Sequence, residues 1–191
     1  MTPSNRDEIH PILATARDLF GRVVYTHETH ERERIIWSGK VCTTNRLNIT
    51  LASATTILAV VSAALPGTAV LILTAISAGA TTGFALWQAS SDAAGKEGQH
   101  RVAAKELLWC RQQLMMLIAD CRIPLPINQL RHTLEIINRE LHAVYKFAPN
   151  TSPEAFKQAE ASIKGGHYSL SDDEVDAMLP EALRTQRASQ P

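Results

Sequence analysis

The sequence has no charge of either sign along its central stretch, residues 47–91, which contains no Lys, Arg, Asp, Glu or His. Over the whole chain, 19 basic and 19 acidic residues cancel, so there is no excess positive charge of the kind that attracts nucleic acid. The first ten residues, MTPSNRDEIH, lack an apolar run, and we expect no cleavable signal peptide. These absences exclude a nucleic-acid-binding class and direct attention to the uncharged centre.

Motifs for catalysis and for metal or cofactor binding are also missing. His27 and His30 come close to the HExxH zinc motif, but only Thr29 stands between Glu28 and the second histidine where the motif needs two residues. The three cysteines are odd in number and have no metal-ligand spacing: Cys42, Cys110 and Cys121. The sequence shows no nucleophile–base pair and no glycine-rich phosphate loop. We therefore expect no enzyme activity, no metal and no cofactor.

Two apolar segments in the centre are each long enough to cross a lipid bilayer. As helices, residues 47–65 and 69–89 would span about 28 and 31 Å, and the hydrocarbon core is about 30 Å thick. Pro66-Gly67-Thr68 between them predicts a helix stop and a turn. Lys and Arg occur on both sides of the pair and are absent from the turn, which places both termini in the cytoplasm. We predict an all-α, multi-pass integral membrane protein with a two-helix transmembrane hairpin and a cytosolic helical bundle.

Helical periodicity on both sides of the hairpin predicts the bundle. We assign residues 1–46 to an amphipathic helix leading into the membrane, 47–91 to the hairpin, 92–147 to an antiparallel helix pair and 148–191 to a helical tail. The first helix has the apolar stripe Ile9, Ile12, Leu13, Ala16, Phe20 and Val23. The pair has two series of the a/d type: Ala103, Leu107, Cys110, Leu114, Leu117 and Cys121, then Ile127, Leu130, Leu134, Ile137, Leu141 and Val144.

Local signals divide the rest of the chain. The stretch 91–98 is weak as a helix because it contains two glycines. Thr151-Ser152-Pro153-Glu154 predicts a helix start capped by Thr151, and Gly165-Gly166 predicts its end. Ser171-Asp172-Asp173-Glu174 predicts a second helix start, and we expect the residues from Thr185 on to be frayed.

Polar residues form a stripe along each apolar segment. On one face of the first lie Asn48, Thr55 and Ser62, and on one face of the second lie Thr74, Ser77, Thr81 and Gln88. Stripes of this kind can line a water-filled path when several hairpins assemble. Alternatively, the hydroxyls bond backbone carbonyls or join packed helices without a pore. The sequence leaves both interpretations open.

A run of small residues, Ala75, Gly79 and Gly83, marks another face of the second segment. It allows close helix packing, either within one hairpin or between subunits. The strongly apolar residues of the first segment contribute only roughly −2 to −5 kcal/mol toward membrane insertion. Such a helix favours protein neighbours, so we expect a homo-oligomer. Trp87 suits a membrane-interface anchor, whereas we expect Trp37 and Trp109 in the core of the bundle.

Two short motifs stand on either side of the hairpin. Tyr-Thr-x-x-Thr-His occupies residues 25–30 and Ala-Pro-x-Thr occupies residues 148–151. Their defining residues are Tyr25, Thr26, Thr29, His30, Ala148, Pro149 and Thr151. In this order around paired apolar helices, they resemble the SLATT domain family, bacterial two-transmembrane proteins of about this size. Glu28 departs from the family pattern, in which a basic residue is common. From the residues alone we expect packing or capping contacts for His27 and His30, with pH sensing or a metal role as the alternative.

The resemblance implies a function and a set of partners. It implies an oligomeric pore-forming effector of antiviral defence, which acts by abortive infection in the bacterial inner membrane. It also implies contact with membrane lipids and a separate sensor or nucleotide-signal protein. The alternative is a membrane anchor or scaffold that recruits a soluble partner through its cytosolic helices without forming a pore.

Overall fold

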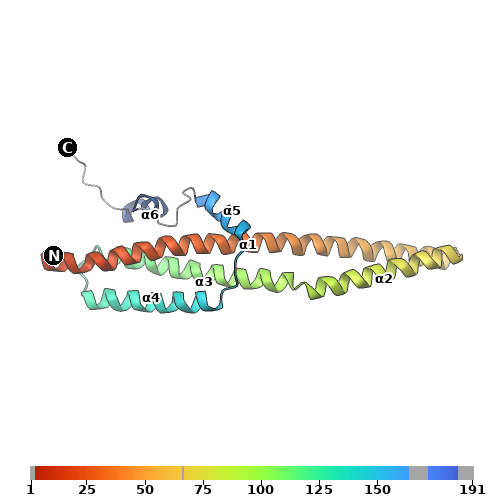
Figure 1. Ribbon diagram of the computed structural model, residues 1–191, viewed down its shortest axis with the longest axis horizontal. Coiled ribbons are helices and arrows are strands. Elements are labelled where there is room, and N and C mark those ends of the chain that lie inside the picture. Colours follow the sequence, from red (N-terminus) through yellow and green to blue (C-terminus); the bar gives the residue numbers. More distant parts are fainter. Residues whose placement is uncertain (1–2, 66, 164–171, 185–191) are drawn as a thin grey trace. The chain divides into compact units, whose positions relative to one another are not determined.

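The computed structural model describes residues 3–65, 67–163 and 172–184 (Figure 1). Its elements are α1 (Pro3–Ala64), α2 (Thr68–Ser90), α3 (Ala93–Asp120), α4 (Ile127–Phe147), α5 (Pro153–Ile163), α6 (Asp172–Met178) and the short 3-10 helix η1 (Glu181–Leu183). The described ranges contain no strand, so the predicted all-α class is confirmed. Pro66 of the predicted turn, the predicted stop at Gly165-Gly166, the cap at Ser171 and the tail from Thr185 lie outside the described residues.

The chain divides into two compact units, and the boundaries fall inside α1 and α3. Unit 1 comprises Met1–Glu33 and Gln99–Pro191, and unit 2 comprises Arg34–Gly98. Unit 1 therefore holds both flanking motifs, and unit 2 holds the uncharged stretch.

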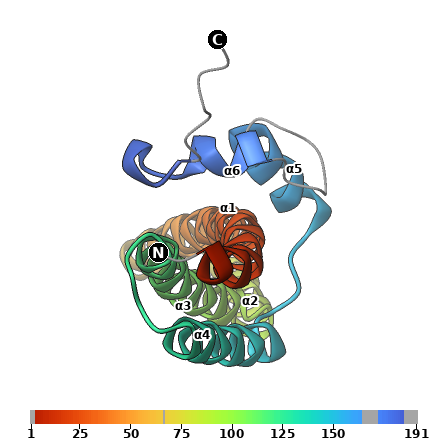
Figure 2. The ribbon, with the colours of Figure 1, turned by 90° about the vertical axis from the view of Figure 1, so that its left-hand side faces the viewer.

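Unit 1 is a helical bundle built on the apolar stripes that the sequence predicts. Figure 2 shows α3 between α4 and the first part of α1, with α5 and α6 on the other side of α1. The ion pair between Arg17 and Asp176, 2.8 Å long and nearly buried, joins α6 to α1. The fully buried large side chains are Phe20, Val23, Leu107, Cys110, Leu114, Leu117, Ile118, Leu130, Ile137, Leu141 and Leu179. The predicted stripes of α1, α3 and α4 thus meet in one core.

Unit 2 has the opposite distribution of polarity. The second part of α1 pairs with α2, and neither has a fully buried residue in this unit. Both α1 and α2 contain stretches long and apolar enough to cross a membrane, so the predicted two-helix hairpin is confirmed. Large apolar side chains stand exposed on both, among them Ile49, Ile57, Val60, Leu71, Ile76 and Leu86. An apolar exterior is what a lipid environment requires.

The junction after the hairpin is shorter than the predicted weak stretch. Only Ser91 and Asp92 interrupt the helices, and α3 already contains Gly95 and Gly98. Asp92 has φ 45°, a left-handed conformation that Asp tolerates better than most residues. Its carbonyl accepts the first backbone bond of α3, from Lys96 N–H at 3.0 Å. Its carboxylate lies over Gly95, where a Cβ atom would overlap it, so a larger residue at 95 would require the Asp92 side chain to move.

The placement of two tryptophans in the bundle core is wrong. Trp109 is 55% exposed, because its neighbours Leu107 and Cys110 hold the inward positions of α3. Trp37 belongs to unit 2 and is half-buried there. The prediction used only their distance along the helices from the uncharged segments, whereas burial depends on the side of the helix from which each side chain projects.

Candidate functional site

The two polar stripes of the hairpin face each other between α1 and α2. Thr55 Oγ1 is 2.7 Å from Ser77 Oγ and 2.9 Å from Thr81 Oγ1, within hydrogen-bonding distance of both. Ser62 Oγ is 2.7 Å from Thr74 Oγ1. All five residues are half-buried. We call this set, Thr55, Ser62, Thr74, Ser77 and Thr81, the hydroxyl seam.

Each threonine of the seam also bonds its own helix. Thr55, Thr74 and Thr81 donate to the carbonyls four residues earlier, at 2.9, 2.8 and 2.8 Å. A hydroxyl has one proton to donate and two lone pairs to accept with. The intrahelical donation therefore leaves Thr55 free to accept from Ser77 and Thr74 free to accept from Ser62. Thr55 and Thr81 both donate within their own helices, so the 2.9 Å between them is a close contact with no proton left to bridge it. The seam satisfies its polar groups without water, as a bilayer demands.

An amide pair ends the stripe near the charged flank. Gln88 Nε2 donates to Asn45 Oδ1 at 2.6 Å, and Asn48 is half-buried one helical turn further along α1. Gln88 Oε1 is buried and has no hydrogen-bond partner among the described residues. Sequence reasoning missed Asn45, because it lies just outside the uncharged stretch. Asn45 stands three residues before Asn48, about one helical turn, so extending the stripe by one turn would have found it.

The small residues of α2 lie away from the seam. Ala75, Gly79 and Gly83 are all exposed. A Cβ atom added at Gly79 or Gly83 would have nothing within 4 Å in the described part of the chain. The close approach that small residues permit is therefore not used within this hairpin. This face remains available for another helix.

In unit 1 the structure brings the two flanking motifs together. The ring of Tyr25 stacks on Phe156 of α5, with centroids 6.5 Å apart. Thr26 and Thr29 each donate to a carbonyl of their own helix four residues earlier, Arg22 O at 2.9 Å and Tyr25 O at 2.8 Å. A side-chain hydrogen bond also joins Thr26 to Tyr145 of α4. The first motif thus holds the tail helix through its aromatic ring.

The second motif forms the connection between α4 and α5. Ala148 ends α4, donating its N–H to Val144 O at 2.8 Å, and Pro149 follows half-buried. Thr151 is exposed, and the predicted Thr151 cap is wrong. Pro153 is the first residue of α5, so the cap falls on Ser152, whose Oγ accepts the Ala155 N–H at 3.2 Å.

Glu33 is the residue that fixes this connection, and sequence reasoning did not single it out. Its carboxylate accepts hydrogen bonds from the Ser152 hydroxyl at 2.6 Å and the Ser152 N–H at 3.0 Å. The side chain is buried, and a negative charge at the start of α5 is favoured by the helix dipole. Glu28 makes a second link, accepting from Ser162 Oγ at 3.1 Å while pairing with Arg32.

Buried histidines lie beside Glu33. His30 Nδ1 and His100 Nδ1 are 3.0 Å apart, and both residues are almost fully buried. A hydrogen bond between them needs one ring to accept, so at least one must be neutral. Burial first, then the neighbouring His100 and His27, lower the pKa of His30 from 6.5 to about 4, against the opposing charge of Glu33. Burial lowers the pKa of His100 too, again opposed by Glu33.

His27 completes the group by contacting the backbone of α3. Its Nδ1 is 2.9 Å from Ala104 O, which requires a protonated Nδ1 as donor. The expectation of packing contacts for His27 and His30 is therefore confirmed. His100 was missed, because it stands alone in a polar stretch of sequence.

This arrangement defines a class of protein. An all-helical chain whose most apolar helices pair through hydroxyls and present apolar surface outward is a membrane protein. A family model for the SMODS and SLOG-associating 2TM effector domain, family 4, matches residues 12–174. The chain belongs to this family, which confirms the resemblance seen in its flanking motifs. No curated protein and no solved structure matches the chain.

The histidine pair predicts acid-sensitive folding of unit 1. In an unfolded chain the two imidazoles titrate near 6.5, whereas both pKa values are lower in the folded protein. Below pH 6.5 the unfolded state binds protons that the folded state does not bind. The free energy of unfolding therefore falls as the pH falls toward 4. We expect His30 alone to account for roughly 1–3 kcal/mol of this loss.

The measurement is denaturant unfolding of the detergent-solubilised protein from pH 7.5 to 4.5, followed by circular dichroism. The double variant His30→Asn/His100→Gln should show a shallower decline than the wild type. His142→Gln is the control, since His142 is exposed on α4. An unchanged slope in the double variant would show that the pair is not the acid-sensitive element.

Proposed function

We propose that this protein is an oligomeric pore-forming effector of a bacterial anti-phage defence system, activated in the inner membrane by a partner protein. The observation that carries the proposal is the hydroxyl seam. Its polar groups lie between two helices whose other faces are apolar. They are the groups of the hairpin that could line a water path if the helices separated. Membership of an effector family supports the same conclusion.

The seam is weak enough to open. Hydrogen bonds between membrane helices contribute about 0.6 kcal/mol each, so the two bonds donated by Ser77 and Ser62 contribute about 1 kcal/mol. A coupling free energy between binding sites is typically 1–3 kcal/mol. Binding of a partner to the cytosolic unit could therefore shift the hairpin from the closed seam to a separated pair. The closed form is the resting state in this proposal.

Assembly uses the small-residue face. Ala75, Gly79 and Gly83 are exposed and leave space for a neighbouring helix. The marginal hydrophobicity of the first membrane segment favours protein contacts over lipid contacts. Subunits packed through this face keep the seam of each hairpin inside the assembly, where separated hydroxyls would meet water rather than lipid.

The direction of insertion follows from charge. Basic residues flank both ends of the hairpin, and its turn has none, so both termini and unit 1 face the cytoplasm. There the bundle is accessible to a sensor or to a protein that makes or reads a nucleotide signal. In this proposal the protein acts on the membrane without catalysing a reaction.

Locking the seam should abolish membrane leakage. In a background with Cys42→Ser, Cys110→Ala and Cys121→Ala, the pair Thr55→Cys/Ser77→Cys replaces two oxygens that lie 2.7 Å apart. We expect a disulfide within one chain on oxidation. Liposomes containing the oxidised protein should then retain an entrapped dye, and reductant should restore at least tenfold faster release.

Each single-cysteine variant serves as a control, since it removes the same hydroxyl without a lock. Equal release from oxidised and reduced protein would show that the seam does not open. Confirmed oligomers that release no dye at any protein-to-lipid ratio, with no depolarisation of cells on induced expression, would instead favour the anchor or scaffold alternative.

Filling the small-residue face should prevent assembly and leave the hairpin intact. In Gly79→Leu/Gly83→Leu the new side chains extend into open space, so the hairpin itself has no reason to rearrange. We expect the oligomer, measured by chemical cross-linking in membranes, to decrease at least tenfold. Ala78→Leu adds similar bulk at an exposed position that is neither three nor four residues from Gly79 or Gly83 and should assemble normally. Unchanged cross-linking of the glycine variant would rule out this interface.

A further inference from the structure

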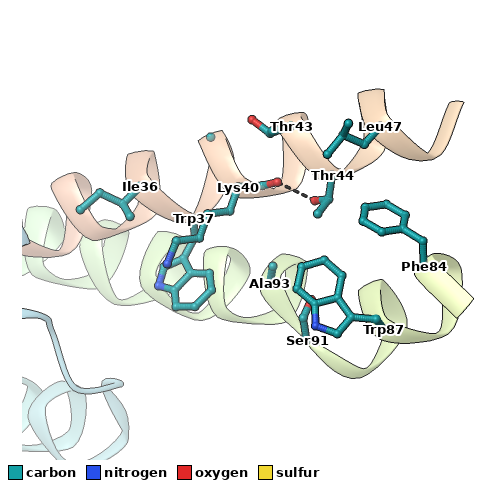
Figure 3. Close-up of a pocket in the computed structure, with 11 residues that line it drawn as sticks. Ile36, Trp37, Lys40, Thr43, Thr44, Leu47, Phe84, Trp87, Ser91 and Ala93 are labelled. Carbon is teal, nitrogen blue, oxygen red and sulfur yellow. Dashed lines mark hydrogen bonds between the residues drawn. The ribbon is translucent and has the colours of Figure 1, made fainter. Parts of the chain in front are cut away.

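A pocket of about 670 Å³ lies within unit 2, where α1, α2 and the first residue of α3 meet (Figure 3). Its walls are mainly aromatic and aliphatic: Trp37 and Leu47 from α1, and Phe84 and Trp87 from α2. Figure 3 shows the rings of Trp37, Trp87 and Phe84 directed into the space between the helices. The volume is in the range of sites that enclose a small molecule or part of a larger one.

Two ammonium groups lie at the Trp37 ring, and Lys40 itself lines the pocket. Lys40 Nζ is 4.0 Å and Lys96 Nζ is 4.6 Å from the centroid of the Trp37 ring. Neither lysine forms an ion pair with a carboxylate in the described residues, whereas the nearby Glu97 pairs with Arg34 at 3.8 Å. Two positive charges held at one indole ring repel each other, and an anion beside the ring would relieve that repulsion.

The pocket also straddles the predicted boundary of the bilayer. Leu47 and Trp87 lie at the ends of the uncharged segments, and Lys40 and Lys96 lie outside them. Tryptophan favours this interfacial depth, and basic groups just cytoplasmic of membrane helices attract anionic headgroups. An occupant that matches both halves needs an apolar chain and a negatively charged head.

We infer that this pocket binds an anionic phospholipid of the cytoplasmic leaflet. One acyl chain lies against Leu47, Phe84 and Trp87, and the phosphate lies beside the Trp37 ring, where it pairs with the ammonium groups of Lys40 and Lys96. The inference rests on the proposed insertion of the hairpin with both termini cytoplasmic. It adds a lipid dependence at the junction between the hairpin and α3, where Asp92 interrupts the helices.

The test compares lipid retention by the resting, full-length protein in detergent, measured by native mass spectrometry. Phosphatidylglycerol and phosphatidylcholine with the same acyl chains are the two probes. The wild type should retain phosphatidylglycerol in preference to phosphatidylcholine. Lys40→Gln/Lys96→Gln should weaken phosphatidylglycerol retention at least tenfold and leave phosphatidylcholine retention unchanged.

The matched control is Lys105→Gln/Lys157→Gln, which removes the same charge at exposed positions of unit 1 and should behave as the wild type. Trp37→Leu should lose the same preference, with helix content by circular dichroism unchanged. Equal retention of the two lipids by the wild type, or unchanged phosphatidylglycerol retention in Lys40→Gln/Lys96→Gln, would overturn the inference. Competition by millimolar inorganic phosphate would also overturn it, by assigning the site to a soluble anion.

The lipid-retention test can fail or succeed independently of the dye-release test of the proposed function. Lipid retention is measured without leakage, so dye release can fail while the lipid preference persists. A lost lipid preference with intact seam-dependent release would contradict the pocket assignment and leave the pore proposal standing.

Discussion

The structure depends on hydroxyl groups that satisfy each other in a place without water. Thr55 accepts and donates at once, bonding Leu51 O of its own helix and lying within reach of Ser77 and Thr81 on the next. This frees the remaining surface of α1 and α2 to be apolar, which a bilayer requires. It also leaves the hairpin with no large buried side chain, so what holds its two helices together is a few weak bonds and close contact.

Unit 1 has the opposite construction, with an apolar core and charged groups at its margin. Arg17 and Glu33 hold the C-terminal helices against α1 through nearly buried ionic and charge-assisted contacts. His30 and His100 lie beside Glu33, so the imidazoles with lowered pKa values are close to the carboxylate that holds the start of α5. The two motifs that mark the family on either side of the hairpin meet in this unit.

The sequence allowed the fold class and the bundle core to be predicted, because periodicity reports helical phase directly. Leu107, Leu114 and Ile137 are buried where their spacing predicts. It also identified the residues of both polar stripes, since a shared face follows from spacing within one helix. It could not show that the stripes face each other, nor that Gly79 faces outward, because the rotation of one helix relative to another depends on three-dimensional packing. Glu33, His100 and the Ser152 cap were missed for a similar reason: their partners are far away in sequence.

The central claim is that the uncharged stretch crosses the membrane and returns. Labelling of cysteines in spheroplasts with a membrane-impermeant maleimide tests this claim most directly. The variant used carries Gly67→Cys, Cys110→Ala and Cys121→Ala and keeps the exposed Cys42. The account predicts that the thiol introduced at position 67 reacts in intact spheroplasts, and that Cys42 reacts only after lysis. Reaction of Cys42 in intact spheroplasts, or of position 67 only after lysis, would contradict it.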